Sequence, residues 1–286
     1  MALRVFDDRG RELFFLRPPQ RVVSLVPSDT LNVFSIGAGS RLVGRTRYCV
    51  APEAGVTGLP TVGGTKDVDV DAVARLQPDL VLCNQEENSR AHVEALIRLQ
   101  LPVLIAFPKR VGEGIAHLAR LARILGVEEE SRDLLRRGLR MLRELEMEGP
   151  PPVDAFVPIW AEPLMTVNAE TFMSDALALA GGRNVFADRE RRYPLQADLG
   201  FGEARPAGDR DVRYPRVTMD EVERRAPRIV LLPDEPHPFT EADAQTFRAR
   251  LPDARVVLCG GRNLSWYGAQ SVEGLPRLRA LIDSLR

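Results

Sequence analysis

The stretch Glu128–Pro152, EEESRDLLRRGLRMLRELEMEGPPP, decides how the chain is organised. About twenty residues run without any strand signal, and Leu135, Leu139, Leu142 and Leu145 are spaced four, three and three apart along one predicted face. Three glutamates open the stretch, where the helix dipole favours negative charge, and a Gly-Pro-Pro-Pro sequence ends it. The pattern predicts one helix about 30 Å long, which is about the width of a small domain.

Short β-branched runs alternate with helical patterns on both sides of this helix. Arg21–Val26 (RVVSLV) and Asp79–Cys83 (DLVLC) read as buried strands before it, and Val153–Trp160 and Arg228–Leu232 read as strands after it. The segments LQPDLVLC and RRAPRIVLL repeat the order helix, proline, strand. This alternation is typical of parallel sheets, so we expect an α/β fold of two Rossmann-like α/β lobes joined by a single long backbone helix. The expected boundaries are an N-terminal lobe over 1–127, a bridging helix over 128–149 and a C-terminal lobe over 150–286.

The composition is that of an ordinary globular protein. The 286 residues include 39 basic and 40 acidic ones, with a formal net charge of −1 and 44% hydrophobic residues, which excludes a disordered chain and a broadly basic nucleic-acid binder. No apolar run approaches the ~18–20 residues of a membrane span, so we expect no membrane-spanning segment. The opening MALRVFDDRGRELFF carries charges where a signal peptide needs an apolar stretch, so the chain as written is expected to stay in the cytoplasm.

The usual catalytic motifs are missing from the sequence. It contains no phosphate-binding P-loop, no nucleophile elbow and no HExxH zinc motif, and Gly37–Gly39 follows a helix where a dinucleotide-binding turn would follow a strand. The three histidines, His92, His117 and His237, share no ligand spacing, and the first two read as helix-surface residues. The three cysteines form no zinc spacing. We therefore expect no catalytic residue and no metal site.

Aromatic residues with a polar tip fall at predicted strand ends or in loops. In an α/β lobe, ligands bind beyond the carboxyl ends of the strands, and such rings suit flat, partly polar ligands there. A single ring of this kind is equally well explained by packing of a loop onto a sheet, but the whole set favours a ligand cleft between the two lobes. The set comprises Tyr48, Trp160, Tyr193, Tyr214, Trp266 and Tyr267.

Four segments resemble the substrate-binding proteins of ABC importers for cobalamin, haem and ferric siderophores. They are RVVSLVPSDTLNVFSIGAGSRLVGRTRYC, LPTVGGTKDVDVDAVARLQPDLVLC, FMSDALALAGGRNVF and YPRVTMDEVERRAPRIVLL. The similarity covers nearly the whole chain and is strongest to the cobalamin-binding members. It implies the class III periplasmic-binding-protein fold, in which one rigid helix joins two α/β lobes.

The resemblance implies a set of ligand-binding positions in the first lobe. Tyr48 corresponds to an aromatic residue that lines the pocket of the cobalamin-binding members, whereas Thr65 and Asn84 stand where those members have tryptophans. Two stacking platforms are therefore missing. A loop that includes Glu86 reads equally well as a contact to a polar ligand group or as a solvated loop. The implied positions are Pro27, Ser28, Asp29, Tyr48, Thr65, Asn84 and Glu86.

The resemblance implies a second set of positions in the other lobe. Trp160 and Met165 lie on the segment that supplies two phenylalanines in the cobalamin-binding members, and Tyr214 corresponds to a further tryptophan. Trp266 and Tyr267 occupy the C-lobe loop that contacts the polar edge of the ligand. Some aromatic positions are kept and others lost, which is compatible with a corrinoid ligand.

Members of this family dock onto an ABC permease through one acidic residue on each lobe. The corresponding positions are Asp71 in VDVDAV and Asp220 in VTMDEV, each one methylene shorter than the family's glutamate. An acid early in a helix is also expected from the helix dipole alone. Family relatives are periplasmic, so either a leader is absent from this sequence or the chain is a cytoplasmic relative that binds a cofactor without a transporter. We favour the second interpretation slightly.

These observations lead to one expected function and three alternatives. We expect a monomeric, non-enzymatic protein that binds a large metal-chelate cofactor between its lobes, with cobalamin or another corrinoid first. A haem or ferric siderophore ligand is the first alternative. A chelatase-like enzyme that processes a tetrapyrrole or metal chelate is the second, although the sequence shows no His/Glu pair for it. A pure interaction protein with a degenerate cleft is the third.

Overall fold

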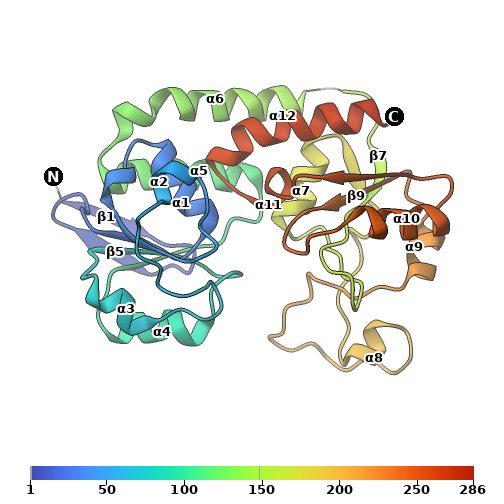
Figure 1. Ribbon diagram of the computed structural model, residues 1–286, viewed down its shortest axis with the longest axis horizontal. Helices are drawn as coiled ribbons and strands as arrows, with labels where there is room; N and C mark the ends of the chain where they lie inside the picture. The colour runs from blue at the N-terminus through green and yellow to red at the C-terminus, as the bar shows by residue number, and fades with distance from the viewer. Residues whose placement is uncertain (1, 148) are drawn as a thin grey trace. The chain divides into compact units, whose positions relative to one another are not determined.

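The computed structural model describes residues 2–147 and 149–286, and the chain divides into two compact α/β units (Figure 1). Unit 1 comprises Met1–Met141 and Trp266–Val272, and unit 2 comprises Leu142–Ser265 and Glu273–Arg286. The division falls inside α6 (Glu128–Glu146), the long helix that the sequence predicts. Glu148, which the predicted bridging helix includes, lies outside the described residues. The expected boundaries differ at one further point, because residues 266–272 return to unit 1.

Unit 1 is built on a four-stranded, wholly parallel sheet. Its strand order is β4-β3-β5-β6, so each crossover carries a helix back over the sheet. An antiparallel hairpin of two further strands precedes the sheet in the chain. The bounds are β1 (Leu3–Phe6), β2 (Glu12–Phe15), β3 (Val22–Ser24), β4 (Leu42–Arg45), β5 (Leu80–Asn84) and β6 (Val103–Ala106).

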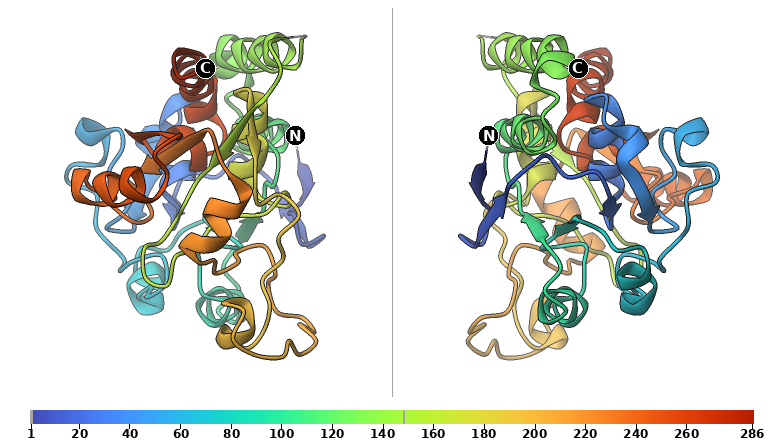
Figure 2. Two further views of the ribbon diagram at one scale, coloured as in Figure 1. Left: turned by 90° about the vertical axis from the view of Figure 1, so that its right-hand side faces the viewer. Right: turned by 90° about the vertical axis from the view of Figure 1, so that its left-hand side faces the viewer.

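Helices cover both faces of this sheet, as Figures 1 and 2 show from three sides. Successive side chains of a strand point to opposite faces, so Leu80 and Leu82 of β5 enter one hydrophobic core and Val81 and Cys83 enter another. Burial on both faces explains why β5 reads as a continuous apolar run. The first core is closed by α1 (Pro27–Ser35) and α5 (Val111–Leu125), and the second by α3 (Val70–Arg75) and α4 (Arg90–Arg98).

Unit 2 contains a second parallel sheet, with strand order β10-β9-β7-β8. Phe156 at the end of β7 is fully buried, with its ring centroid 5.2 Å from that of Phe186 and 6.1 Å from that of Phe247. These aromatic contacts join the sheet to α10 (Glu241–Arg250) and to the chain after β8. The bounds are β7 (Val153–Phe156), β8 (Gly182–Asn184), β9 (Ile229–Pro233) and β10 (Arg255–Cys259).

Several helices of unit 2 begin at a threonine whose hydroxyl accepts a backbone N–H of the first turn, as Thr171, Thr218 and Thr240 do. The predicted irregular insertion, 188–214, contains one short helix, α8. Within the described residues, no helix combines the length and apolar character that a bilayer span requires. The remaining helices are η1 (Gly39–Arg41), α2 (Glu53–Val56), α7 (Phe172–Leu179), α8 (Leu195–Asp198), α9 (Met219–Arg225), α10 (Glu241–Arg250), α11 (Arg262–Ser265) and α12 (Ala269–Ser284).

The apolar face of α6 differs from the predicted leucine row. Leu139 is 54% exposed, whereas Ser131, Gly138 and Met141 are buried. A Cβ atom on Gly138 would lie 3.1 Å from Ile115 Cδ1, so the absence of a side chain there lets α6 approach α5 closely. The buried face thus combines Met141 with two small residues that permit close contact, which a count of leucines does not reveal.

Candidate functional site

The carboxyl edge of the unit 1 sheet gathers the first-lobe positions that the sequence singles out. Pro27, Ser28 and Asp29 follow β3 as the first turn of α1, and all three are buried. Tyr48 follows β4 and is 53% exposed, and Asn84 ends β5. Parallel strands end at one edge of a sheet, so the fold brings together residues that are far apart in the sequence.

Asn84 holds the loop after β5 in place. It is 3% exposed, and its side-chain oxygen accepts the backbone N–H groups of Glu86 and Glu87 at 2.7 and 3.2 Å. Asn88 completes the loop, because its Oδ1 accepts the Asn84 N–H and its Nδ2 donates to the carbonyls of Leu25 and Thr65, both at 3.1 Å. Asn84 and Asn88 thus tie together three loops of this edge. The predicted ligand contacts of Thr65, Asn84 and Glu86 remain predictions.

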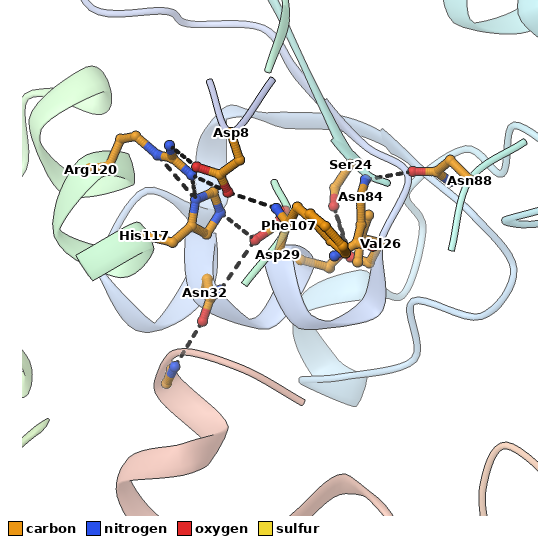
Figure 3. Close-up of polar contacts among 12 residues, drawn as sticks. Asp8, Ser24, Val26, Asp29, Asn32, Asn84, Asn88, Phe107, His117 and Arg120 are labelled. Atoms are coloured by element: carbon orange, nitrogen blue, oxygen red, sulfur yellow. Dashed lines mark hydrogen bonds and ion pairs between the residues drawn. The ribbon is translucent and has the colours of Figure 1, made fainter. Parts of the chain in front are cut away.

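A chain of buried polar side chains lies beneath this edge (Figure 3). Asp29 Oδ1 is 2.9 Å from His117 Nε2 and accepts Asn32 Nδ2 at 3.2 Å. Asn32 Oδ1 in turn accepts the Ala269 N–H at 2.8 Å. Asp29, Asn32 and His117 are each at most 2% exposed. The expectation that His117 lies on a helix surface is wrong, because this position belongs to the buried face of α5.

Arg120 fixes the protonation pattern of this chain. A guanidinium group only donates hydrogen bonds, so His117 Nδ1, 2.6 Å from Arg120 Nη2, is the acceptor. The proton of the neutral imidazole therefore sits on Nε2 and is donated to Asp29. Arg120 also donates to both oxygens of Asp8, at 2.6 and 3.1 Å. Arg120 thus donates in two directions, to Asp8 on one side and through His117 toward Asp29 on the other.

Asp8 at the outer end of the chain is held ionised. Burial alone would raise the pKa of Asp8, but the hydrogen bonds from Arg120 and from the Phe107 N–H outweigh it and lower the pKa below the ordinary value. Asp8, Phe107, His117 and Arg120 line a hollow of about 560 Å³, together with Lys109, Glu113 and Ala116. The β1–β2 hairpin is thereby tied to α5.

Trp266 and Tyr267 complete unit 1, not the second lobe to which the sequence assigns them. They are 7% and 3% exposed, and the Tyr267 ring meets the His117 ring edge-on at 5.7 Å. Burial and the negative charge of Asp29 raise the pKa of Tyr267 well above its ordinary value. Gly268 follows with φ of +81°, and a Cβ there would lie 2.3 Å from Asn32 Oδ1. This glycine lets the chain cross α1 closely enough to join its polar side chains.

Tyr48 forms the solvent-facing part of the unit 1 edge. The guanidinium carbon of Arg47 lies 5.2 Å from the centre of the Tyr48 ring, and Arg47 also pairs with Asp67 at 2.7 Å. The Asp67 pKa is lowered by the hydrogen bond from Arg47. Tyr48 therefore presents an exposed ring with a charged neighbour at the edge where the sequence predicts a ligand.

The carboxyl edge of the unit 2 sheet carries a three-stranded extension of short β-bridges. Trp160 pairs with Met165, and Met165 pairs with Arg216 on its other side. Directly paired residues of antiparallel strands point to the same face, so these three side chains form one row. Trp160 is 44% exposed, while its Nε1 donates to the Glu162 carbonyl at 3.1 Å and its ring lies 5.3 Å from that of His237. Tyr214, which is half-buried, lies on the same strand as Arg216.

The two acids that the resemblance assigns to docking are both exposed, and each stands in the first turn of a helix. Asp69 caps the first of these helices by accepting the Ala72 N–H, which leaves Asp71 free of capping. Asp220 pairs with Arg250 at 2.7 Å. The two acids thus differ in their surroundings, and their docking role remains a prediction.

The sequence reasoning misses the polar residues that build both edges. Asn32 is three residues after Asp29 on α1, so helical spacing could have linked them. His117 lies between buried positions of α5, a pattern that indicates a core-facing residue. Arg216 carries no local signal, because it is brought beside Met165 only by the path of the chain after the insertion.

The site offers few side chains that could coordinate a metal ion. Within residues 2–147 and 149–286, no group of three or more His, Cys, Asp and Glu side chains is gathered closely enough to hold a metal ion. Cys49, Cys83 and Cys259 are free thiols, and burial raises the pKa of Cys259 to about 12. The neutral thiol is a poor metal ligand.

The sequence and the fold both match known proteins. The profile of the periplasmic binding protein family matches residues 22–250. The vitamin B12-binding protein of Yersinia pestis (strain Pestoides F) is 25% identical over 216 residues, which cover 74% of this chain and 69% of that protein. The vitamin B12-binding protein of Yersinia pseudotuberculosis (serotype O:1b, strain IP 31758) matches to the same extent.

Two solved structures share the fold. The periplasmic vitamin B12 binding protein of Vibrio cholerae has a TM-score of 0.76 at 18% identity, covering 94% of this chain and 98% of that one. A periplasmic heme binding protein from Pseudomonas aeruginosa has a TM-score of 0.72 at 20% identity, covering 92% of each chain. The predicted α/β fold class and family resemblance are confirmed. The chain belongs to the periplasmic binding protein family, and its fold is that of the class III members.

Proposed function

We propose that this protein binds a large, flat metal chelate, a corrinoid in the first instance, without transforming it. The observation that carries the proposal is Trp160, an exposed indole that is fixed before any ligand arrives. Its N–H donates to Glu162 O, His237 lies against its ring, and the Phe239 ring supports His237 at 4.6 Å. A ring held in one orientation loses little conformational freedom on binding, which favours affinity for a planar ligand.

The other exposed or half-buried residues that support the proposal lie at the carboxyl edges of the two sheets. Met165 is paired beside Trp160, and its thioether adapts to irregular apolar surfaces. Tyr214 and Tyr48 add rings with a polar tip. The family match and the vitamin B12-binding relatives favour a corrinoid over other chelates.

Haem is the second candidate ligand. The specific observation is that Asn84, which stands where the cobalamin-binding members carry a tryptophan, is buried as a loop clamp. An asparagine has no ring for a corrin to stack on, and the side chain of Asn84 is already bonded to the loop backbone. A smaller flat chelate needs fewer stacking platforms, and the fold is shared with a heme binding protein.

A calorimetric titration separates these candidates. Cyanocobalamin and haemin are titrated separately into the purified protein, and the absorption spectrum of each mixture is recorded. Trp160→Ala should weaken binding of the preferred chelate by about 10- to 100-fold, the scale of losing one stacked ring with its buried area. Phe14→Ala is the matched control, because Phe14 is 60% exposed on the β1–β2 hairpin, outside both edges. Failure of the wild-type protein to bind either chelate would refute the proposal.

We further infer that the ligand is handed to an ABC permease through Asp71 and Asp220. Asp71 is exposed and can meet a cation of the permease directly, whereas Asp220 must first exchange Arg250. Arg250 retains Glu223 as a second partner, so this exchange leaves no unpaired charge. Asp71→Asn should therefore reduce ligand uptake through a reconstituted permease more than Asp220→Asn does. Asp253→Asn, at another exposed acid of unit 2, is the control, and equal uptake by all three variants would exclude docking through these acids.

A further inference from the structure

The insertion of unit 2 is organised around one buried ion pair. Arg189 is 6% exposed and contacts Asp198 at 3.0 Å and Glu221 at 3.1 Å. Asp198 is 2% exposed and accepts two backbone N–H groups as well, from Arg192 through Oδ1 at 2.9 Å and from Arg216 through Oδ2 at 2.8 Å. A single carboxylate therefore joins the chain at residue 192 to the chain at residue 216.

This arrangement places two further arginines close together. Arg191 immediately precedes the anchored residue 192, and its own N–H donates to the Val212 carbonyl at 2.7 Å. Arg216 belongs to the row formed with Trp160 and Met165. Burial lowers the pKa of Arg216, and the positive charge of Arg191 lowers it further, while the charge of Asp198 opposes the shift. Because the backbone N–H groups of residues 192 and 216 meet on the same carboxylate, the two arginines lie close enough for their positive charges to repel each other.

Within the described residues, neither guanidinium group is held in an ion pair, although the charge of Asp198 acts on Arg216. In the described part of the chain, no aspartate or glutamate forms an ion pair with Arg191 or with Arg216. The positive charge of Arg191 helps to lower the pKa of Asp211, but Asp211 forms its ion pair with Arg213, at 2.5 Å. Arg191 is instead packed over the Tyr193 ring at 4.4 Å, and Arg216 donates to the Tyr214 carbonyl at 3.1 Å. Both side chains are thus held in place while their charges stay available.

Two like charges in a half-buried place repel each other, and an anion bound between them would offset this repulsion. Guanidinium groups bind phosphate and carboxylate through pairs of parallel hydrogen bonds. We propose that Arg191 and Arg216 form an anion subsite at the carboxyl edge of the unit 2 sheet, which receives a phosphate or carboxylate group on the rim of the chelate stacked at Trp160. This inference rests on the proposed function, and it adds a charge requirement that the aromatic residues alone do not impose.

Two pairs of probes distinguish the source of the anionic group. Cyanocobalamin carries a phosphodiester that dicyanocobinamide lacks, and haemin carries two carboxylates that its dimethyl ester lacks. Wild-type protein should bind the anionic member of the preferred pair at least ~10-fold more tightly, the scale of one charge-assisted hydrogen bond. Arg191→Gln and Arg216→Gln should remove this preference, while Arg224→Gln, at an exposed arginine of α9 outside the subsite, should keep it.

A probe without a chelate tests the subsite independently. Inorganic phosphate at constant ionic strength should raise the thermal unfolding midpoint of the wild-type protein, and the Arg191→Gln/Arg216→Gln double variant should lose this response. If no chelate binds but phosphate stabilises in this way, the proposed function fails and the subsite stands. Equal affinity for both members of the preferred pair, or phosphate stabilisation that survives in the folded double variant, would overturn the subsite. Circular dichroism confirms that each variant is folded.

Discussion

The two units place charge at the carboxyl edges of their sheets in opposite ways. In unit 1, Arg120 donates to Asp8 and to His117, and the buried His117 in turn donates to the buried Asp29. In unit 2, the buried pair Arg189–Asp198 is satisfied in the same way, but within the described residues no acidic side chain forms an ion pair with Arg191 or Arg216. These contacts of the first edge are therefore a structural support beneath the exposed ring of Tyr48. The second edge also holds the positive charges of Arg191 and Arg216, and such charges are expected at a binding surface.

The largest expected effect comes from the anchor of unit 2. Arg189→Met removes the cation from between Asp198 and Glu221 and leaves a buried carboxylate without its charge partner. The free energy of unfolding of unit 2 should fall by about 3–5 kcal/mol. Trp160 reports on unit 2 in urea unfolding followed by fluorescence, provided that Trp266 is replaced by Phe. Arg183→Met, at an exposed pair with Asp154, is the control and should cost less than about 1 kcal/mol.

The corresponding change in unit 1 should have a somewhat smaller effect. His117→Leu deprives Asp29 of one donor and Arg120 of one acceptor, so unit 1 should lose about 2–4 kcal/mol of stability. Trp266 reports on this unit in a Trp160→Phe background. His92→Leu on α4 changes the same residue type at a half-buried position outside the chain and should cost little. Equal losses for the two variants would show that the buried chain contributes nothing beyond packing.

Asp8 should give unit 1 an acid-dependent stability. Its pKa is lowered in the folded state, so the stabilisation is complete above the ordinary carboxyl value of about 4 and is lost as the pH falls through the lower folded value. Asp8→Asn should flatten this part of the stability profile and cost about 1–2 kcal/mol at neutral pH, the scale of a charge-assisted hydrogen bond. Urea midpoints of both proteins between about pH 2 and pH 6 provide the measurement. Parallel profiles would mean that the Asp8–Arg120 contact does not stabilise the fold.

The smallest effect should also have the opposite sign. Arg216→Gln removes one of two repelling charges, so the ligand-free protein should keep its stability or gain up to about 1 kcal/mol. Added salt should reduce the gain, because it screens the repulsion in the wild-type protein. A loss of stability above about 1 kcal/mol would place Arg216 among the structural residues of unit 2. The contrast between the two edges would then disappear.

Sequence patterns predicted the strands, the long helix and the fold class because these depend on local periodicity. β5 and β9 are buried on both faces, and their continuous apolar runs are visible without any tertiary information. The aromatic residue Trp160 was found for a related reason, since it follows a strand that could be recognised. The face of α6 was predicted only in part: Leu135 packs against the core of unit 1, but Leu139 is exposed, because the contact with α5 depends on the space available at Gly138.

The sequence by itself determined that the chain forms two parallel α/β sheets with aromatic residues where the strands end. Only the tertiary structure decided that residues 266–272 belong to unit 1, that His117 is a buried link, and that the chain at Arg192 and the chain at Arg216 meet on Asp198. Periodicity reports which residues are buried in an element, because burial repeats with the geometry of that element. Polar partners such as Asn32 and Ala269, 237 positions apart, meet only when distant parts of the chain pack together. A contact of this kind does not repeat along the sequence, so a single sequence gives no pattern from which to predict it.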